Sequence, residues 1–212
     1  MNYCQKIYSK NEGERLDGFE KRTNAKKKQI LDAAFALMNS DQGIKNLKID
    51  TLAANANVGK TTIFKYFGSK ETIIHEVFKR YINYLITDAK QIIQENRSFE
   101  ETLIALSHNK MHFIEHMHHQ FYLDLMAYVT TSQGNGLSVL MRIYSKESLN
   151  IMLDLFHRGR KEGKVDLKYS DEFLLQYFQA IVEGISNPKI YENLAPYTEE
   201  WTEMLIKGLA PK

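Results

Sequence analysis

Cysteine and proline are scarce in this chain of 212 residues, and the two scarcities exclude different structures. Cys4 is the only cysteine, so an internal disulfide is excluded and a reducing compartment is expected. Pro188, Pro196 and Pro211 are the only prolines, so the chain before Pro188 has no helix breaker. No segment alternates apolar and polar residues with the β-branched enrichment of strands. We therefore predict an all-α fold.

Long apolar runs are missing as well. No stretch approaches the length that a bilayer requires, and residues 1–10 lack the apolar centre of a signal peptide. We expect a cytoplasmic protein without a membrane partner.

Recognisable catalytic arrangements are absent from the sequence too. There is no serine in a glycine-flanked elbow, no second cysteine, and no pair of carboxylates in a familiar setting. The sequence predicts neither an enzyme nor a cofactor.

Charge is divided unevenly along the chain. Residues 1–80 hold 15 Lys and Arg against 9 Asp and Glu, a net +6, whereas residues 81–212 hold 13 against 17, a net −4. A basic front and an acidic remainder suit a protein whose amino-terminal part binds a polyanion.

The segment IDTLAANANVGKTTIFKYFGSKE, residues 49–71, has the pattern of two short helices around a tight turn. Apolar residues with spacings of three and four place one side of the first helix against a neighbour. The turn falls at residues 55–59, where asparagine and glycine tolerate a positive backbone angle. Val58 is expected to be a buried plug between the helices.

The second helix of the pair is predicted to begin near Gly59 or Lys60 and to divide into two faces. Ile63, Phe64 and Phe67 are expected to pack inward. The opposite face offers ammonium groups, hydroxyls and a phenol, and a helix divided in this way can lie in a major groove.

This segment resembles the DNA-binding signature of the TetR family of bacterial transcriptional regulators. The resemblance runs from KKKQILDAAFALMNSDQGIKNL through the turn at residues 57–60 to Thr62-Ile63-Phe64-Lys65-Tyr66-Phe67 and Ser69-Lys70-Glu71. There are four departures from the family: it usually has glycine at the position of Asn57, serine at Gly59, a phosphate-contacting tyrosine at Phe64, and a small hydroxyl residue at Lys48.

The resemblance implies a ligand-responsive regulator, most often a repressor, that binds a pseudo-palindromic DNA operator as a homodimer. We expect four residues of the second motif helix to enter the groove: Lys60, Thr61, Thr62 and Tyr66. Three lysines are expected mainly at phosphates: Lys48, Lys65 and Lys70.

Two other classes of function stay open at this point. ANANVGKT, residues 54–61, fits a relaxed phosphate-loop pattern and would make a nucleotide-binding protein, but that chemistry requires a buried strand before the loop. A helical interaction protein without DNA affinity is the second alternative.

Three domains are predicted: an extension at residues 1–23, the helix-turn-helix domain at 24–69, and a helical effector-binding and dimerisation domain at 70–212. The first strong helix should begin after Thr23 or Asn24 and close at Gly43. Ser69 should cap a long connecting helix, and Ser170 another.

Two carboxy-terminal helices are apolar around more than one face, which is too much for packing against a single neighbour. The resemblance implies that they pair with their copies in a second subunit, and a monomer with an unusually central helix is the alternative. The predicted dimer residues are Phe173, Tyr177, Phe178, Ile181, Ile185, Trp201, Met204 and Leu205.

The central helices carry many flexible or aromatic side chains, and the resemblance implies an effector cavity among them for a small apolar or aromatic molecule. The predicted lining is Phe113, Tyr122, Met126, Tyr144, Met152 and Phe156. His108, His112, His116 and His119 have spacings of four, four and three, which predicts that they lie along one helical stripe. We interpret them as surface or pocket-lining residues and predict no metal site.

Overall fold

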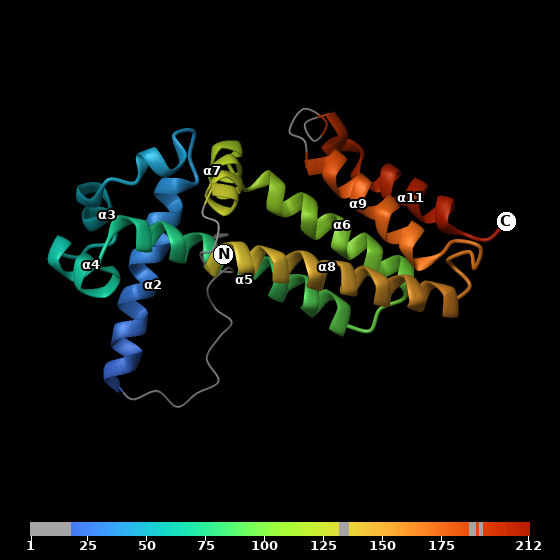
Figure 1. Cartoon of the computed structure of the whole chain (residues 1–212), viewed down its shortest axis with the longest axis horizontal. Coiled ribbons are helices and arrows are strands. Elements are labelled where there is room, and N and C mark those ends of the chain that lie inside the picture. The colour runs from blue at the N-terminus through green and yellow to red at the C-terminus, as the bar shows by residue number, and fades with distance from the viewer. Residues whose placement is uncertain (1–17, 132–135, 187–189, 191–192) are drawn as a thin grey trace. The chain divides into compact units, whose positions relative to one another are not determined.

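The computed structural model describes residues 18–131, 136–186, 190 and 193–212, and over these residues it consists of α-helices and short 3₁₀ turns without a strand. The all-α prediction is confirmed. No helix in the described ranges has the length and apolar character needed to span a bilayer. Figure 1 shows the elements, which are α2 (Gly18–Met38), η1 (Gly43–Asn46), α3 (Ile49–Asn55), α4 (Lys60–Phe67), α5 (Lys70–Gln94), α6 (Phe99–Glu115), α7 (His119–Thr131), α8 (Gly136–Lys161), α9 (Asp171–Ser186), η2 (Ala195–Tyr197) and α11 (Thr198–Leu209).

The predicted start of the first helix is wrong. It begins at Gly18, so Thr23 and Asn24 lie inside it instead of capping it. The added residues include Glu20, an acidic residue in the first turn, which favours a helix amino-terminus, and the Arg22 side chain donates a hydrogen bond of 3.0 Å to the Gly18 carbonyl. The helix also ends at Met38, before Gly43.

The two serine caps are confirmed. Ser69 Oγ accepts a hydrogen bond of 3.2 Å from the Thr72 amide at the start of α5. Ser170 Oγ accepts one of the same length from the Phe173 amide at the start of α9. Each hydroxyl satisfies an amide that has no partner within its own helix.

The chain divides into two compact units. Unit 1 comprises residues 1–84 and 117–141, and unit 2 comprises residues 85–116 and 142–212. Helices α5 and α8 each contribute residues to both units. The boundary at residue 70 that the motif suggests stays a prediction.

The core of unit 1 is built around Phe121 of α7. Its ring centroid lies 5.3 Å from those of Phe35, Phe78 and Tyr81, which come from α2 and α5. Edge contacts of this kind add to the free energy gained by burying the rings. They hold α7 firmly against the helices that carry the motif.

A second link in unit 1 joins α7 to η1. The Asp124 carboxylate accepts a hydrogen bond of 2.6 Å from the Ile44 amide. Gly43, just before it, has φ 57°, and a Cβ at that position would lie 1.9 Å from Asp124 Oδ2. Only glycine combines this backbone angle with so close an approach.

The core of unit 2 joins α6, α8, α9 and α11. Fully or nearly fully buried members come from each helix and from the loop after α8: Phe99, Leu103, Met152, Leu155, Phe156, Val165, Leu174, Leu205 and Leu209. Each side chain of this size stabilises the fold by about 1.5–3 kcal/mol when it leaves water.

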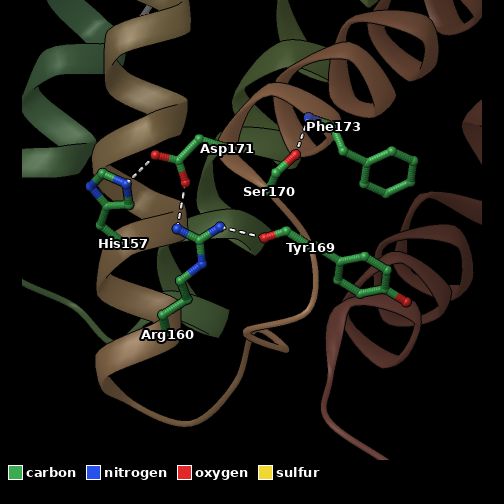
Figure 2. A network of polar contacts seen from close by, with 6 residues as sticks. All are labelled: His157, Arg160, Tyr169, Ser170, Asp171 and Phe173. Atoms are coloured by element: carbon green, nitrogen blue, oxygen red, sulfur yellow. Dashed lines mark hydrogen bonds and ion pairs between the residues drawn. The ribbon is translucent and has the colours of Figure 1, made fainter.

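Polar contacts tie the end of α8 to the start of α9. Figure 2 shows the Asp171 carboxylate between His157, whose Nε2 lies 2.8 Å from Oδ2, and the Arg160 guanidinium. Arg160 also donates a hydrogen bond of 2.6 Å to the Tyr169 carbonyl. Hydrogen bonds from His157 and then Arg160 hold the pKa of Asp171 below its ordinary value.

Candidate nucleic-acid interface

The turn between α3 and α4 is a complete Schellman motif. The Val58 amide donates to the Ala53 carbonyl at 3.0 Å, and the Asn57 amide donates to the Ala54 carbonyl at 3.1 Å. Asn57 has φ 46°, the left-handed angle that glycine or asparagine adopts at this place. Asparagine therefore performs here the role of the glycine usual in the family, and the predicted turn is confirmed.

Helix α2 fixes this turn through a contact that the sequence did not reveal. Gln29 Nε2 donates a hydrogen bond of 2.7 Å to the Ala56 carbonyl, 27 residues further along the chain. Ala56 itself is fully buried, as are Leu52 and Ile30 on the facing helices. Val58 is half-buried, where a buried plug was predicted.

Helix α4 has one buried and one exposed face. Ile63 and Phe67 are buried, as predicted, because residues four apart lie on the same side of a helix. Phe64 is 44% exposed, so its predicted inward position is wrong. One residue along a helix turns the side chain by about 100°, which carries Phe64 away from the core.

The outer face of α4 holds the four predicted groove residues. Lys60 and Thr61 are exposed, and Thr62 and Tyr66 are half-buried. Lys60 forms an ion pair with Asp50 of α3 in which both side chains are largely exposed. Exposed pairs contribute little to stability, so the Lys60 ammonium can exchange its partner at small cost.

The three predicted phosphate contacts surround that face. Lys65 is exposed near the end of α4, and Lys70 is half-buried at the first position of α5. Lys48 is exposed at the N-cap of α3 and makes no side-chain cap hydrogen bond, as its amine predicts. These roles stay predictions.

The phosphate-loop interpretation is wrong. The residues that precede the GKTT segment form helix α3 and the Schellman turn, not a buried strand. Lys60 points to a carboxylate instead of an amide cradle. The geometry that would converge on a nucleotide phosphate is therefore missing at this segment.

Unit 2 contains two neighbouring apolar cavities that both reach Lys110, and we name them the Lys110 cavities. The larger is about 150 Å³ and the smaller about 50 Å³, and Leu106, Phe178 and Val182 line both. Two predicted ligand residues, Phe113 and Met152, line the larger one.

The other predicted ligand residues lie elsewhere. Phe156 is 1% exposed within the core of unit 2, and Tyr122 and Met126 belong to α7 in unit 1. The side chain of Tyr144 is outside the described residues. The sequence pattern could not separate cavity from core, because both are apolar.

The predicted dimer residues divide into exposed and enclosed sets. Phe173 is 50% exposed, Tyr177 and Met204 are also exposed, and the rings of Phe173 and Tyr177 stack at 6.0 Å. Phe178, Ile181 and Trp201 are partly buried against the core of unit 2. Leu205 is 5% exposed inside the same chain, which removes it from any interface, and the Ile185 side chain is outside the described residues.

The histidines do not form one stripe. His108 and His112 lie on α6, His116 comes directly after its end, and His119 begins α7, so the four-residue stripe is wrong. Ligand atoms of His112, Glu115 and His116 lie within 4.8 Å of one another, and all three residues are exposed. His108 and His112 also line an open cavity of about 580 Å³. The absence of a metal site stays a prediction.

The comparisons agree with the motif and with the fold. Residues 30–77 match the model of the bacterial regulatory proteins of the tetR family. The Fatty acid metabolism regulator protein of Bacillus subtilis is 23% identical over 199 residues, 91% of this chain and all of that protein. The transcriptional repressor KstR2 of Mycolicibacterium smegmatis is 25% identical over 156 residues, 68% of this chain and 73% of that protein.

A solved structure shows the same fold. The transcriptional regulator FadR of Bacillus subtilis, in complex with stearoyl-CoA, matches with a TM-score of 0.59 at 23% identity, covering 85% of this chain and 97% of that one. The family match covers α3 and α4, the end of α2 and the start of α5. The chain is therefore a DNA-binding transcriptional regulator similar to the bacterial regulatory proteins of the tetR family.

Proposed function

We propose that this protein is a repressor that binds a pseudo-palindromic operator as a homodimer and releases it when a small apolar or aromatic molecule binds unit 2. The observation that carries the proposal is the complete turn before α4, since it fixes one helix with its polar face outward. The proposal assigns no catalytic step, and the protein would act in the cytoplasm, where bacterial DNA lies.

Operator recognition is proposed for the outer face of α4. Lys60, Thr61, Thr62 and Tyr66 would meet base edges and sugars, because a recognition helix presents its amino-terminal residues to the groove. Lys48, Lys65 and Lys70 would neutralise phosphates and make affinity depend on salt. Exposed Phe64 has no hydroxyl for phosphate and offers an apolar contact such as a thymine methyl requires.

A second copy of the chain is proposed to cover α9. Tyr169, Phe173 and Tyr177 stack in sequence at 5.5 and 6.0 Å, and Phe173 and Tyr177 are exposed. Aromatic side chains uncovered in this way are typical of the centre of a protein interface. Met204 of α11, 74% exposed, is proposed to extend the same interface.

Relief of repression is proposed to follow from ligand binding in unit 2. A ligand shifts a conformational equilibrium only when it binds one state better than the other. The state with the ligand would hold the two α4 helices of the dimer at a separation that does not match successive major grooves. The stearoyl-CoA bound by the FadR relative supports a lipophilic effector.

Selection of bound fragments from sheared host DNA by the full-length protein tests this function. The expected result is recovery of a short palindromic site, together with a mass of two chains in light scattering at micromolar concentration. Weak and equal recovery of all fragments would contradict the operator. That result would favour the alternative function, a helical interaction protein without DNA affinity. The binding of such a protein to its partners would not change on substitution of Lys60 or Tyr66.

A further inference from the structure

Two residues that line the Lys110 cavities carry hydrogen-bond donors without a partner in the described residues. The indole Nε1 of Trp201 is buried and donates no hydrogen bond to any group in the described residues, although Trp201 lines the smaller cavity. Lys110 lines both cavities, and its ammonium makes no hydrogen bond or ion pair within the described ranges. The two residues come from α11 and α6.

The absence of a partner is costly for the indole nitrogen, because buried polar groups are normally hydrogen-bonded, and Lys110 is itself half-buried. An ammonium offers three donors and an indole one, and neither nitrogen can accept a hydrogen bond. The described residues that line the two cavities include no aspartate or glutamate. Burial lowers the pKa of Lys110, as expected for an amine removed from water with no counter-charge.

The missing group must therefore be an acceptor, and a negative charge would match the lysine best. Charge-assisted hydrogen bonds to a carboxylate are shorter and stronger than those between neutral groups. A cationic or purely donating molecule would leave both nitrogens unsatisfied. The chemistry of the two donors thus selects for the sign of the ligand's charge.

The rest of the wall selects for an apolar body. Leu106, Phe178 and Val182 line both cavities, and Phe113 and Met152 extend the larger one. An apolar cavity of about 150 Å³ is large enough to hold a molecule such as benzene. The size corresponds to a single ring or a short alkyl chain.

We propose that the Lys110 cavities bind a small amphipathic carboxylate, with its oxygens at Lys110 and Trp201 and its apolar body against Leu106, Phe178 and Val182. This inference rests on the proposed effector response and names the chemical class of the effector. By accepting from both residues, the carboxylate would link α6 to α11.

Trp201 is the only tryptophan in the chain, so its fluorescence reports on the site directly. The full-length protein is titrated with 3-phenylpropionate, with the corresponding alcohol 3-phenylpropan-1-ol, and with 3-phenylpropylamine. We expect the Trp201 fluorescence to change saturably with the acid. The acid should bind at least about tenfold more tightly than the alcohol, and the amine should bind most weakly. Hexanoate, tested beside hexanol, should show the same preference if the carboxylate is the shared determinant.

Lys110→Met keeps a long apolar side chain but removes the charge, and it should reduce the preference for the acid to about twofold or less. Lys161→Met, at an exposed lysine of α8, is the matched control and should retain the preference. Circular dichroism confirms that both variants are folded. Equal affinity for acid and alcohol, no saturable binding of any probe, or an unchanged preference in Lys110→Met would overturn the proposal.

The titration contains no DNA, so its outcome is independent of the operator. If the DNA selection recovers a palindromic site and the acid does not bind, the proposed effector class is wrong but the proposed repressor function is retained. If the acid binds with the predicted lysine dependence and no operator is recovered, the cavity assignment stands and the repressor fails.

Discussion

The outer face of α4 and the Lys110 cavities both offer ammonium and neutral donors to a ligand, but in opposite surroundings. Lys60 is exposed and already paired with Asp50. Lys110 lines an apolar cavity and has no partner in the described residues. Lys60, in contact with water, is suited to a hydrated polyanion. Lys110 and Trp201, which line the cavities, are suited to one small hydrogen-bond acceptor. A lysine ammonium is thus suited to a different kind of ligand at each place, because the two lysines differ in burial.

Lys60→Ala tests the exposed side of the comparison with the largest expected effect. Loss of one groove contact should reduce operator affinity by roughly 10- to 100-fold, about 1–3 kcal/mol, with no change in acid binding at Lys110. Fluorescence anisotropy of a labelled operator measures the affinity. Lys207→Ala is the control, because Lys207 is also an exposed lysine in an ion pair, with Glu203, but lies on α11. An unchanged affinity would move the groove assignment to other residues.

Lys110→Met tests the enclosed side. Removing an ammonium that is half-buried and unpartnered in the described residues should stabilise the ligand-free protein modestly, by about 1 kcal/mol, which raises Tm by roughly 2–4 °C in a chain of this size. Differential scanning calorimetry measures the change, and Lys161→Met should leave Tm close to that of the parent. A lower Tm for Lys110→Met would mean that the amine is satisfied in the native protein.

Substitutions at Asn57 test how firmly the turn holds α4. Asn57→Ala places an ordinary side chain at φ 46° and should destabilise unit 1 by about 1 kcal/mol. Asn57→Gly removes that strain and should be close to neutral, because glycine adopts the left-handed angle readily. Thermal melts compare the two. Equal losses for both variants would show that the asparagine side chain matters, and not its backbone angle.

Asp50→Asn releases Lys60 and removes a negative charge near the expected phosphates. Because the exposed pair is weak, operator affinity should rise only modestly, by about two- to fivefold, most clearly at low salt. Asp154→Asn, at an exposed position of α8, is the control. A fall in affinity would indicate that Asp50 orients Lys60 for binding.

Asp171 should give the smallest effect, visible as a dependence on pH. Its pKa is lowered in the folded protein by His157 and Arg160, so its contribution to stability is present above the ordinary value of 3.8 and is lost as pH falls through the folded value. The Tm difference between the parent and Asp171→Asn should therefore be largest near neutrality and shrink in acid. Glu172→Gln, at the next exposed carboxylate, should show no such convergence. A difference that grew in acid would contradict the network in Figure 2.

The sequence predicts the local fold around α4 better than the lining of the Lys110 cavities, and the reason is physical. A turn with Asn57 at a left-handed angle and a helix divided into two faces depend on neighbours within a few residues, so local pattern was enough for α3 and α4. The apolar character of Phe64 alone predicts an inward position, but a turn of about 100° per residue separates it from the buried Ile63. Gln29, which anchors the turn from 27 residues away, gave no local signal.

The cavity lining could not be predicted in the same way. Phe156 and Phe113 are both buried aromatic residues of unit 2, yet of the two only Phe113 lines one of the Lys110 cavities. The sequence gives no local signal for Lys110, because a lysine on a helix is usually solvated. Its place beside the cavities depends on residues of α8, α9 and α11. Leu205 was assigned to a dimer because its helix is apolar, whereas the same chain already buries it.

The most direct test of α4 as the operator-reading helix is a titration of the selected palindrome against a duplex of equal length with both half-sites scrambled, over a range of salt concentrations. The account predicts specific binding roughly a thousandfold or more tighter than binding to the scrambled duplex, with both affinities falling as salt rises. Equal affinities for the two duplexes at every salt concentration would contradict it.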